Sequence, residues 1–187
     1  MPRPTKLTPP EVLRAEDLSP LVGAEGPDLS SALFALTTWG TSTRFREQLM
    51  SACDFPLPGD LAAFLLVNQL IYRGVARPTD LADAIDTGRS NISKVVARLE
   101  ASELVFRAAD PADDRAVVVA LTDHGRSVAR RILAATEALH MPAVEHWSPE
   151  EIAILGQLLV KLARSLDALP NHPLSSAAGV SLDTPSP

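Results

Sequence analysis

The hydrophobic pattern of this chain changes its period in the middle of the sequence and then changes back. Over residues 28–103, apolar side chains recur every three or four positions, which is typical of amphipathic helices. Residues 104–110 (LVFRAAD) and 115–121 (RAVVVAL) are instead short and apolar, the second rich in valine, with PADD between them. We expect these two runs to form a β-hairpin. The helical period returns from residue 122, so the chain must fold as helices that flank one small hairpin.

Capping and breaking residues divide the first helical region. Asp28 can cap a helix whose apolar positions continue to about Cys53, where the segment DFPLPG interrupts it. Asp60 can cap a second helix, and Gly74 can end it because glycine readily adopts the backbone conformation that follows a helix. We therefore expect one long helix before the interruption and a shorter helix after it.

Three further elements precede the hairpin. Pro78 suits the first turn of a short helix, because its missing N–H would have no partner at that position. Asp86-Thr87-Gly88 is a turn sequence, and residues 89–103 follow with a helical period. The order helix, turn, helix and hairpin predicts a winged helix-turn-helix in a chain that is otherwise mainly α-helical.

Two more helices are expected after the hairpin. Thr122 can cap the first of them, and Pro142 should end or kink it. Ser148-Pro149-Glu150-Glu151 combines a capping box with proline at the first helical position, which is a specific signal for a helix start. The last helix carries an apolar stripe at helical spacing, formed by Ile152, Leu155, Leu159, Leu162 and Leu166.

These signals divide the chain into five segments. We assign a flexible proline-rich arm to residues 1–27 and a dimerisation helix with its connector to residues 28–59. The winged helix-turn-helix is assigned to residues 60–121 and the C-terminal dimerisation helices to residues 122–169. Residues 170–187 are assigned to a disordered tail. The helices outside the winged helix have more apolar surface than a lone winged helix can cover, so we expect them to form a homodimer. They are expected at residues 29–52, 122–141 and 149–169.

Composition excludes several classes of protein. Hydrophobic residues make up 46% of the chain but aromatic residues only 4%, so the core must be built mainly from aliphatic side chains. No run approaches the roughly eighteen consecutive apolar residues of a membrane-spanning helix, and no signal peptide is recognisable. Cys53 is the only cysteine, so no intramolecular disulfide is expected. We expect a cytoplasmic protein that does not enter the membrane.

The charge of the chain is unevenly distributed. The net charge is −6, whereas DNA-binding proteins are often basic because phosphates dominate their affinity. Residues 77–131 contain nine Lys or Arg and nine Asp or Glu, so this segment is neutral and the excess acidity lies elsewhere. A DNA-binding surface in the winged helix would therefore depend on a few well-placed cations.

The helix at residues 89–103 has the side chains of a helix that contacts DNA. A major groove admits one α-helix, and the second helix of a helix-turn-helix supplies it. Ile92, Val96 and Leu99 share one face and should point into the core. The other faces carry cations and short hydrogen-bonding groups, which can contact base edges and phosphates. The candidate DNA-binding residues of this helix are Arg89, Ser90, Asn91, Ser93, Lys94 and Arg98.

The segment LADAIDTGRSNISKVVARLEASELVFRAADPADDRAVVVALTDHGR resembles the MarR family (multiple antibiotic resistance regulators) of winged-helix repressors. The resemblance rests on the first Leu-Ala, the serine register ending at Leu99, the wing DPADDR and the closing LTDHGR. It places the family's Asp-x-Arg signature on Asp113 and Arg115, which implies an arginine in the minor groove and an aspartate that steadies the wing. With two-fold symmetry, it implies a homodimer on double-stranded DNA at a pseudo-palindromic operator.

The chain departs from the family pattern at three places. Asp86-Thr87-Gly88 stands where Gly-Leu-Ser is usual before the recognition helix, so the helix cap is weaker. Glu103 replaces the glycine that commonly precedes Leu-Val, and Asp114 occupies a wing position that is often basic. Asp114 adds repulsion near phosphates, which bears on affinity or on the identity of the operator.

Aromatic residues raise the question of an effector. In relatives, small molecules bind between the helical and winged-helix parts, and Trp39, Phe64 and Tyr72 could line such a site here. The expected ligand is small and largely apolar or aromatic. Residues of this type are more often simply part of the core.

Other functions were weighed against DNA binding. A winged helix can serve as a protein-interaction module, because fold alone does not settle function. Cys53 could be a redox-sensing thiol, but no Lys, Arg or His lies within six residues to stabilise a thiolate, which favours a buried, inert cysteine. Glu137 and His140 are one helical turn apart, yet no second ligand pair with zinc spacing accompanies them. We expect no metal, no cofactor and no catalytic site.

Overall fold

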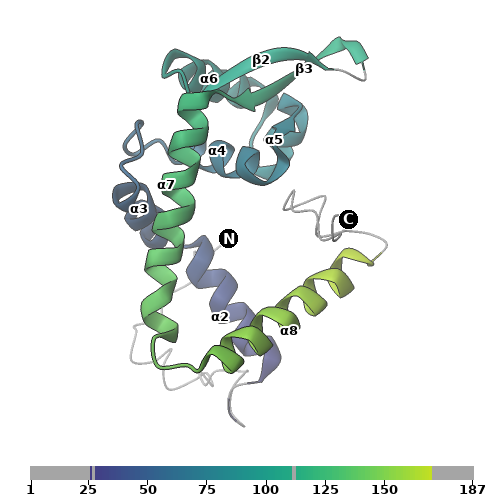
Figure 1. The fold of residues 1–187 in the computed structure, drawn as a ribbon. Helices are drawn as coiled ribbons and strands as arrows, with labels where there is room; N and C mark the ends of the chain where they lie inside the picture. Colours follow the sequence, from purple (N-terminus) through teal and green to yellow (C-terminus); the bar gives the residue numbers. More distant parts are fainter. Residues whose placement is uncertain (1–25, 27, 111–112, 170–187) are drawn as a thin grey trace, which may run out of the picture. The chain divides into compact units, whose positions relative to one another are not determined.

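The computed structural model describes residue 26 and residues 28–110 and 113–169 (Figure 1). The expectations for a flexible arm at residues 1–27 and a disordered tail at residues 170–187 lie, but for residue 26, outside this part of the chain. The described residues divide into two compact units, one ending at Phe45 and the other beginning at Arg46. Residues 46–59, grouped above with the dimerisation helix, thus belong to the unit that contains the winged helix.

The first unit contains helix α2, Leu29–Thr41, and the start of α3, Thr43–Ala52. Asp28 forms the expected cap as part of a capping box with Ser31. The expectation of one continuous helix to about Cys53 is wrong, because Ser42 adopts an extended conformation between α2 and α3. The Ser42 hydroxyl accepts a hydrogen bond from the N–H of Phe45 at 3.3 Å, as a helix-capping serine does, so it starts a new helix.

The core of the second unit is formed by α4 (Leu61–Arg73), α5 (Pro78–Ala84), α6 (Arg89–Ala101) and α7 (Asp123–His140). The caps expected at Asp60 and Thr122 are present, and Gly74 ends α4 with a positive φ of 70°. The core is mainly aliphatic, as composition predicts. Its largest fully buried side chains are Phe64, Leu66, Leu70, Leu81, Ile92, Leu99, Leu104 and Ile132.

A three-stranded antiparallel sheet completes the winged helix. Strands β2 (Val105–Asp110) and β3 (Asp113–Leu121) form the expected hairpin, which is the wing. A short strand β1, Val75–Ala76, pairs with Val119 and Ala120 of β3 and gives the order β1-β3-β2. The sequence did not predict β1, because two residues are too few to show a strand period. This strand attaches the base of the wing to the loop that leads into α5.

The C-terminal part contains the 3-10 turn Met141–Val144, where Pro142 was expected to end the preceding helix, and α8, Pro149–Asp167. Ser148 and Glu151 form the expected capping box, with Pro149 at the first helical position. No residue of α8 is buried in a single chain, so its apolar stripe faces solvent. No helix among the described residues is both long and apolar enough to cross a membrane.

Candidate nucleic-acid interface

Helix α6 has the two faces expected of a recognition helix. Ile92, Val96 and Leu99 are at most 2% exposed and fix the helix against the core, together with Val95. Burial of each such side chain contributes roughly 1.5–3 kcal/mol, so the outer face is held on a rigid support. The polar side chains at the start of the helix are exposed, namely Arg89, Ser90, Asn91, Ser93 and Lys94.

The turn before α6 orients its first residues. Asp86 has a φ of 50°, in the left-handed region that aspartate tolerates better than most residues. The Asn91 amide Nδ2 donates to Thr87 Oγ1 at 2.8 Å, and the Ser93 hydroxyl donates to the Arg89 carbonyl at 3.2 Å. Gly88 caps the helix without a side-chain hydrogen bond. Within the described chain, the Arg89 and Lys94 side chains have no hydrogen-bond or ion-pair partner, so both cations are available to a ligand.

Arg98 differs from the other candidates on α6 because it is already paired. Its guanidinium donates to both carboxylate oxygens of Asp60, with Nε–Oδ2 at 2.6 Å and Nη2–Oδ1 at 3.1 Å. The hydrogen bond from Arg98 is the main reason why the pKa of Asp60 lies below its ordinary value. This pair ties the recognition helix to the N-terminus of α4, 38 residues earlier in the sequence.

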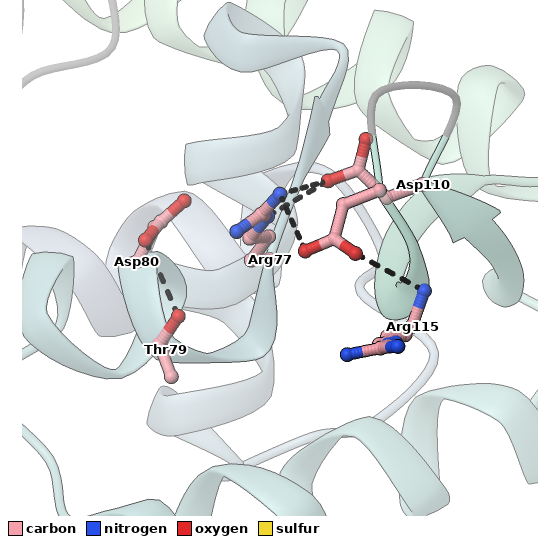
Figure 2. A network of polar contacts seen from close by, with 6 residues as sticks. Arg77, Thr79, Asp80, Asp110 and Arg115 are labelled. Carbon is pink, nitrogen blue, oxygen red and sulfur yellow. Dashed lines mark hydrogen bonds and ion pairs between the residues drawn. The ribbon is translucent and has the colours of Figure 1, made fainter.

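The wing carries a network of polar contacts around Arg77, which sequence analysis did not single out (Figure 2). Arg77 Nε and Nη2 lie 2.7 Å and 2.6 Å from Asp110 Oδ2, and Nη2 lies 3.7 Å from Asp113 Oδ2. Asp113 Oδ1 accepts a hydrogen bond from the backbone N–H of Arg115 at 3.1 Å. Asp113 therefore holds the backbone of Arg115, while the Arg115 guanidinium is exposed and has no partner among the described residues.

A second ion pair joins the wing to the recognition helix. Arg107 Nη1 on β2 lies 3.4 Å from Glu100 Oε2 on α6. Both side chains are partly exposed, so the pair contributes little stability in water. It lies near the base of the wing, because Arg107 pairs with Val119, a residue that also pairs with β1.

The aromatic candidates for an effector site lie in different units, Trp39 in the first and Phe64 and Tyr72 in the second. Phe64 is 2% exposed and packs edge-on against Phe55, with ring centroids 5.3 Å apart, whereas Trp39 and Tyr72 are about half-exposed. A hollow of about 330 Å³ opens at the end of α3, lined by residues that include Met50, Phe55 and Pro58. Phe64 thus lies behind the wall of this hollow and does not line it.

Cys53 and the histidines form no reactive centre among the described residues. The Cys53 side chain is buried, and burial raises the pKa of its thiol. Arg131 binds the backbone instead, since its guanidinium donates to the carbonyl oxygens of Cys53 and Asp54 at 3.0 Å and 3.1 Å. The described part of the chain contains no group of three His, Cys, Asp or Glu residues placed to hold a metal ion.

Comparison with known proteins connects this geometry to one family. The MarR family model matches residues 58–116. The uncharacterised HTH-type transcriptional regulator YxaD of Bacillus subtilis (strain 168) is 29% identical over 104 residues, which are 56% of this chain and 73% of YxaD. YfiV of the same organism is also 29% identical, over 61% of this chain and 69% of YfiV. Residues 58–116, which contain most of the winged helix, are thus similar to the MarR family of transcriptional regulators.

Solved structures agree with this fold. The apo form of wild-type MarR from E. coli superposes with a TM-score of 0.52 at 20% identity, covering 73% of this chain and 97% of that chain. The transcriptional regulator Tm0710 from Thermotoga maritima gives a TM-score of 0.53 at 21% identity, over 73% of this chain and 95% of that chain. The expected mainly α fold with a winged helix is confirmed, and it is the fold of these MarR-type transcriptional regulators.

Two of the departures from the MarR pattern lie at residues with a left-handed backbone conformation. Asp86 and Glu103 stand where the family commonly has glycine, and their φ values are 50° and 56°. Both backbone positions are in the left-handed region, where glycine carries no steric penalty. At both turns this chain therefore has a residue that the backbone conformation tolerates less well than glycine.

Proposed function

We propose that this chain is a homodimeric transcriptional repressor of the cytoplasm that binds a pseudo-palindromic operator. Each protomer places α6 in a major groove and Arg115 in the adjacent minor groove. The observation that carries the proposal is a set of exposed cations, Arg89, Lys94 and Arg115, that have no partner among the described residues and lie on a rigid winged helix. Such cations give up no internal ion pair when they bind phosphates or bases, so the neutral charge of the segment does not prevent binding.

The residues of α6 divide into two roles in this proposal. Arg89 and Asn91 have planar groups that suit base edges, and Lys94 suits a base or a phosphate. Ser90 and Ser93 are short and exposed, so they suit phosphate oxygens. Arg98 would have to leave Asp60 to contact DNA, which makes it the weakest of the candidates.

Exposed apolar helices support the homodimer. On α8, Ile154 and Leu158 are 55% and 58% exposed, and the stripe that includes Leu155 and Leu159 is also open to solvent. On α2, considered by itself, Phe34 is 71% exposed. Contiguous apolar surface of this kind is rare on a monomer and marks an interface. A second copy of the chain offers the same surfaces, as two-fold symmetry requires.

An effector site is the least constrained part of the proposal. The hollow at the end of α3, about 330 Å³, is large enough for a small molecule and has the aromatic ring of Phe55 in its wall. A ligand that binds it with different affinity in two dimer conformations would shift operator affinity, and by linkage DNA would shift the affinity for the ligand equally. Within the same unit, Phe64 and Tyr72 are not among the residues that line this hollow.

Binding isotherms at several salt concentrations test the DNA contacts. Genomic binding-site mapping first supplies the operator, and random DNA serves as the comparison. Replacing a base-contacting residue among Arg89, Asn91 and Lys94 by alanine should cost roughly 1–3 kcal/mol on the operator and relax preference at one position. Arg115→Ala should weaken binding to many sites and reduce the salt dependence. The control is Arg130→Ala, which removes one charge from α7.

Two results would replace the proposal. If none of the four alanine variants changes DNA affinity, the winged helix is a protein-interaction module without specific DNA contacts. If the variants lose affinity but deletion of the gene lowers transcription at the mapped operator, the chain is an activator. A repressor requires that transcription rises in the deletion strain.

A further inference from the structure

Arg77 links the body of the winged helix to the outer part of its wing. Arg77 lies directly after β1 and directly before α5, so its backbone belongs to the body. Its guanidinium reaches 33 residues along the chain to Asp110 at the end of β2, and it also faces Asp113 at the start of β3 (Figure 2). The side chain therefore spans the junction between the body and the outer wing.

The outer wing needs such a contact because regular pairing ends below it. Strand β1 pairs with β3 only at Val119 and Ala120, near the base of the wing. The β2–β3 register is irregular between Ala109 and Asp110, where Ala109 pairs with Val117 but Asp110 pairs with Asp113. Arg115 lies inside this irregular stretch, so the ladder of backbone hydrogen bonds does not fix its position.

The charges at the junction make Arg77 difficult to replace. The Asp110 side chain is only 12% exposed, and the Arg77 guanidinium at 2.6 Å compensates its charge. A guanidinium has several donors in a planar fork, which allows Arg77 to face Asp110 and Asp113 together. Without Arg77, two carboxylates would lie close to each other and near the DNA phosphates that the wing approaches.

We infer that Arg77 is a positioning residue for Arg115. Arg77 Nη2 lies 3.7 Å from one carboxylate oxygen of Asp113, and the other oxygen of Asp113 accepts the N–H of Arg115 at 3.1 Å. The chain of contacts sets where the Arg115 side chain leaves the wing, and Arg77 neutralises the carboxylates beside it. This inference rests on the proposed minor-groove contact of Arg115, so its test needs one measurement with DNA and one without.

The measurement with DNA is a double-mutant cycle on the operator. Arg77→Ala should weaken binding by roughly 5- to 20-fold and reduce the preference for A·T pairs at the wing position. The double variant Arg77→Ala/Arg115→Ala should bind within about twofold of Arg115→Ala alone, because Arg77 acts through Arg115. Arg130→Ala controls for the loss of one positive charge. Additive losses in the double variant would overturn the inference.

The measurement without DNA follows hydrogen exchange of the Arg115 amide. Arg77→Ala should speed this exchange while amides in the α6 core stay protected, since the wing is released without unfolding. Arg77→Lys keeps the positive charge but not the planar guanidinium, so the Arg115 amide should exchange at an intermediate rate. This variant keeps the test usable if the alanine variant does not fold. Unchanged exchange in both variants would overturn the inference even if DNA binding by Arg115 is established. If Arg115→Ala alone leaves DNA binding intact, the minor-groove proposal fails, and faster exchange would still show that Arg77 holds the wing.

Discussion

At the scale of single residues, Glu103 stands at a position whose backbone conformation favours glycine. Its φ is 56°, and a side chain in this region costs roughly 1–2 kcal/mol relative to the right-handed helix. Glu103→Gly removes this cost but gains freedom in the unfolded chain, which offsets part of the benefit. We expect a net increase of about 0.5–1 kcal/mol in the free energy of unfolding, measured by urea denaturation.

A glycine elsewhere provides the control for Glu103. Ala97→Gly, at an exposed position inside α6, should lower the free energy of unfolding by about 1 kcal/mol, because it adds freedom to the unfolded chain without relieving strain. If both variants destabilise the protein equally, the left-handed turn at Glu103 is not strained. The informative result is therefore that the free energy of unfolding rises in Glu103→Gly and falls in Ala97→Gly.

Cys53 is expected to be chemically inert in the folded protein. Burial raises the pKa of the thiol, so the thiolate that reacts with oxidants and thiol reagents is scarce near pH 7. A colorimetric thiol reagent should react with Cys53 at the rate of unfolding and rapidly only in denaturant. Peroxide should leave operator binding unchanged in the wild type and in Cys53→Ser. A peroxide response that the serine variant loses would instead make Cys53 a sensor.

At the scale of elements, the Asp60–Arg98 pair couples the start of α4 to the recognition helix. Because the pKa of Asp60 is lowered in the folded state, its contribution to stability is fully present above the ordinary aspartate pKa. This contribution is lost as the pH falls through the lowered pKa of Asp60, because the carboxylate then becomes protonated in the folded protein as well. Stability from this pair should therefore decline below about pH 4.

Asp60→Asn isolates the ion pair from the helix cap. Asparagine caps as well as aspartate and can still accept the N–H of Ala63, so only the charge on Arg98 loses its partner. We expect a loss of about 1 kcal/mol at pH 7 that disappears in strong acid, measured by denaturation at several pH values. Asp83→Asn, on an exposed side chain of α5, is the control and should show neither effect. A pH-independent loss in Asp60→Asn would assign the effect to the cap.

Which elements the sequence predicts depends on how local their causes are. Asp60, Thr122 and Ser148 start helices through hydrogen bonds that reach only three residues ahead, so a short sequence motif contains the whole cause. The break at Ser42 has a local cause too, but the apolar period of the neighbouring segments conceals it. Strand β1 exists only because β3 lies beside it, so no property of Val75–Ala76 alone could reveal it.

The same distinction applies to the candidate DNA-binding site. The exposed face of α6 follows from helical spacing once Ile92 and Leu99 are placed inward, and these expectations hold. The pairing of Arg98 with Asp60 and of Arg77 with Asp110 joins residues 38 and 33 positions apart. Such partners are chosen by the tertiary fold, and spacing along the sequence contains no information about them.

At the scale of the whole molecule, the exposed stripe on α8 predicts that the proposed homodimer depends on this helix. Leu159→Glu places a charge within the stripe and should convert the dimer into monomers, because burial of an unpaired carboxylate is costly. Gln157→Glu adds the same charge about 200° around the helix and should leave the dimer intact. Sedimentation velocity of both variants checks the prediction. Equal dissociation by both charges, or by neither, would place the interface elsewhere.

A dimer of winged helices also predicts how operator spacing affects affinity. Two α6 helices related by a two-fold axis contact major grooves on one side of the duplex only if the half-sites are about 10 base pairs apart, or a multiple of that distance. Inserting five base pairs at the operator centre rotates one half-site to the opposite side, so the affinity should fall to that of a single half-site. The same five base pairs inserted outside the operator should have no effect, which controls for length and composition. Leu159→Glu should bind the original and the expanded operator alike, because a monomer cannot sense the spacing. If the wild type also binds both operators alike, each winged helix binds DNA independently, and the proposed symmetric dimer is wrong.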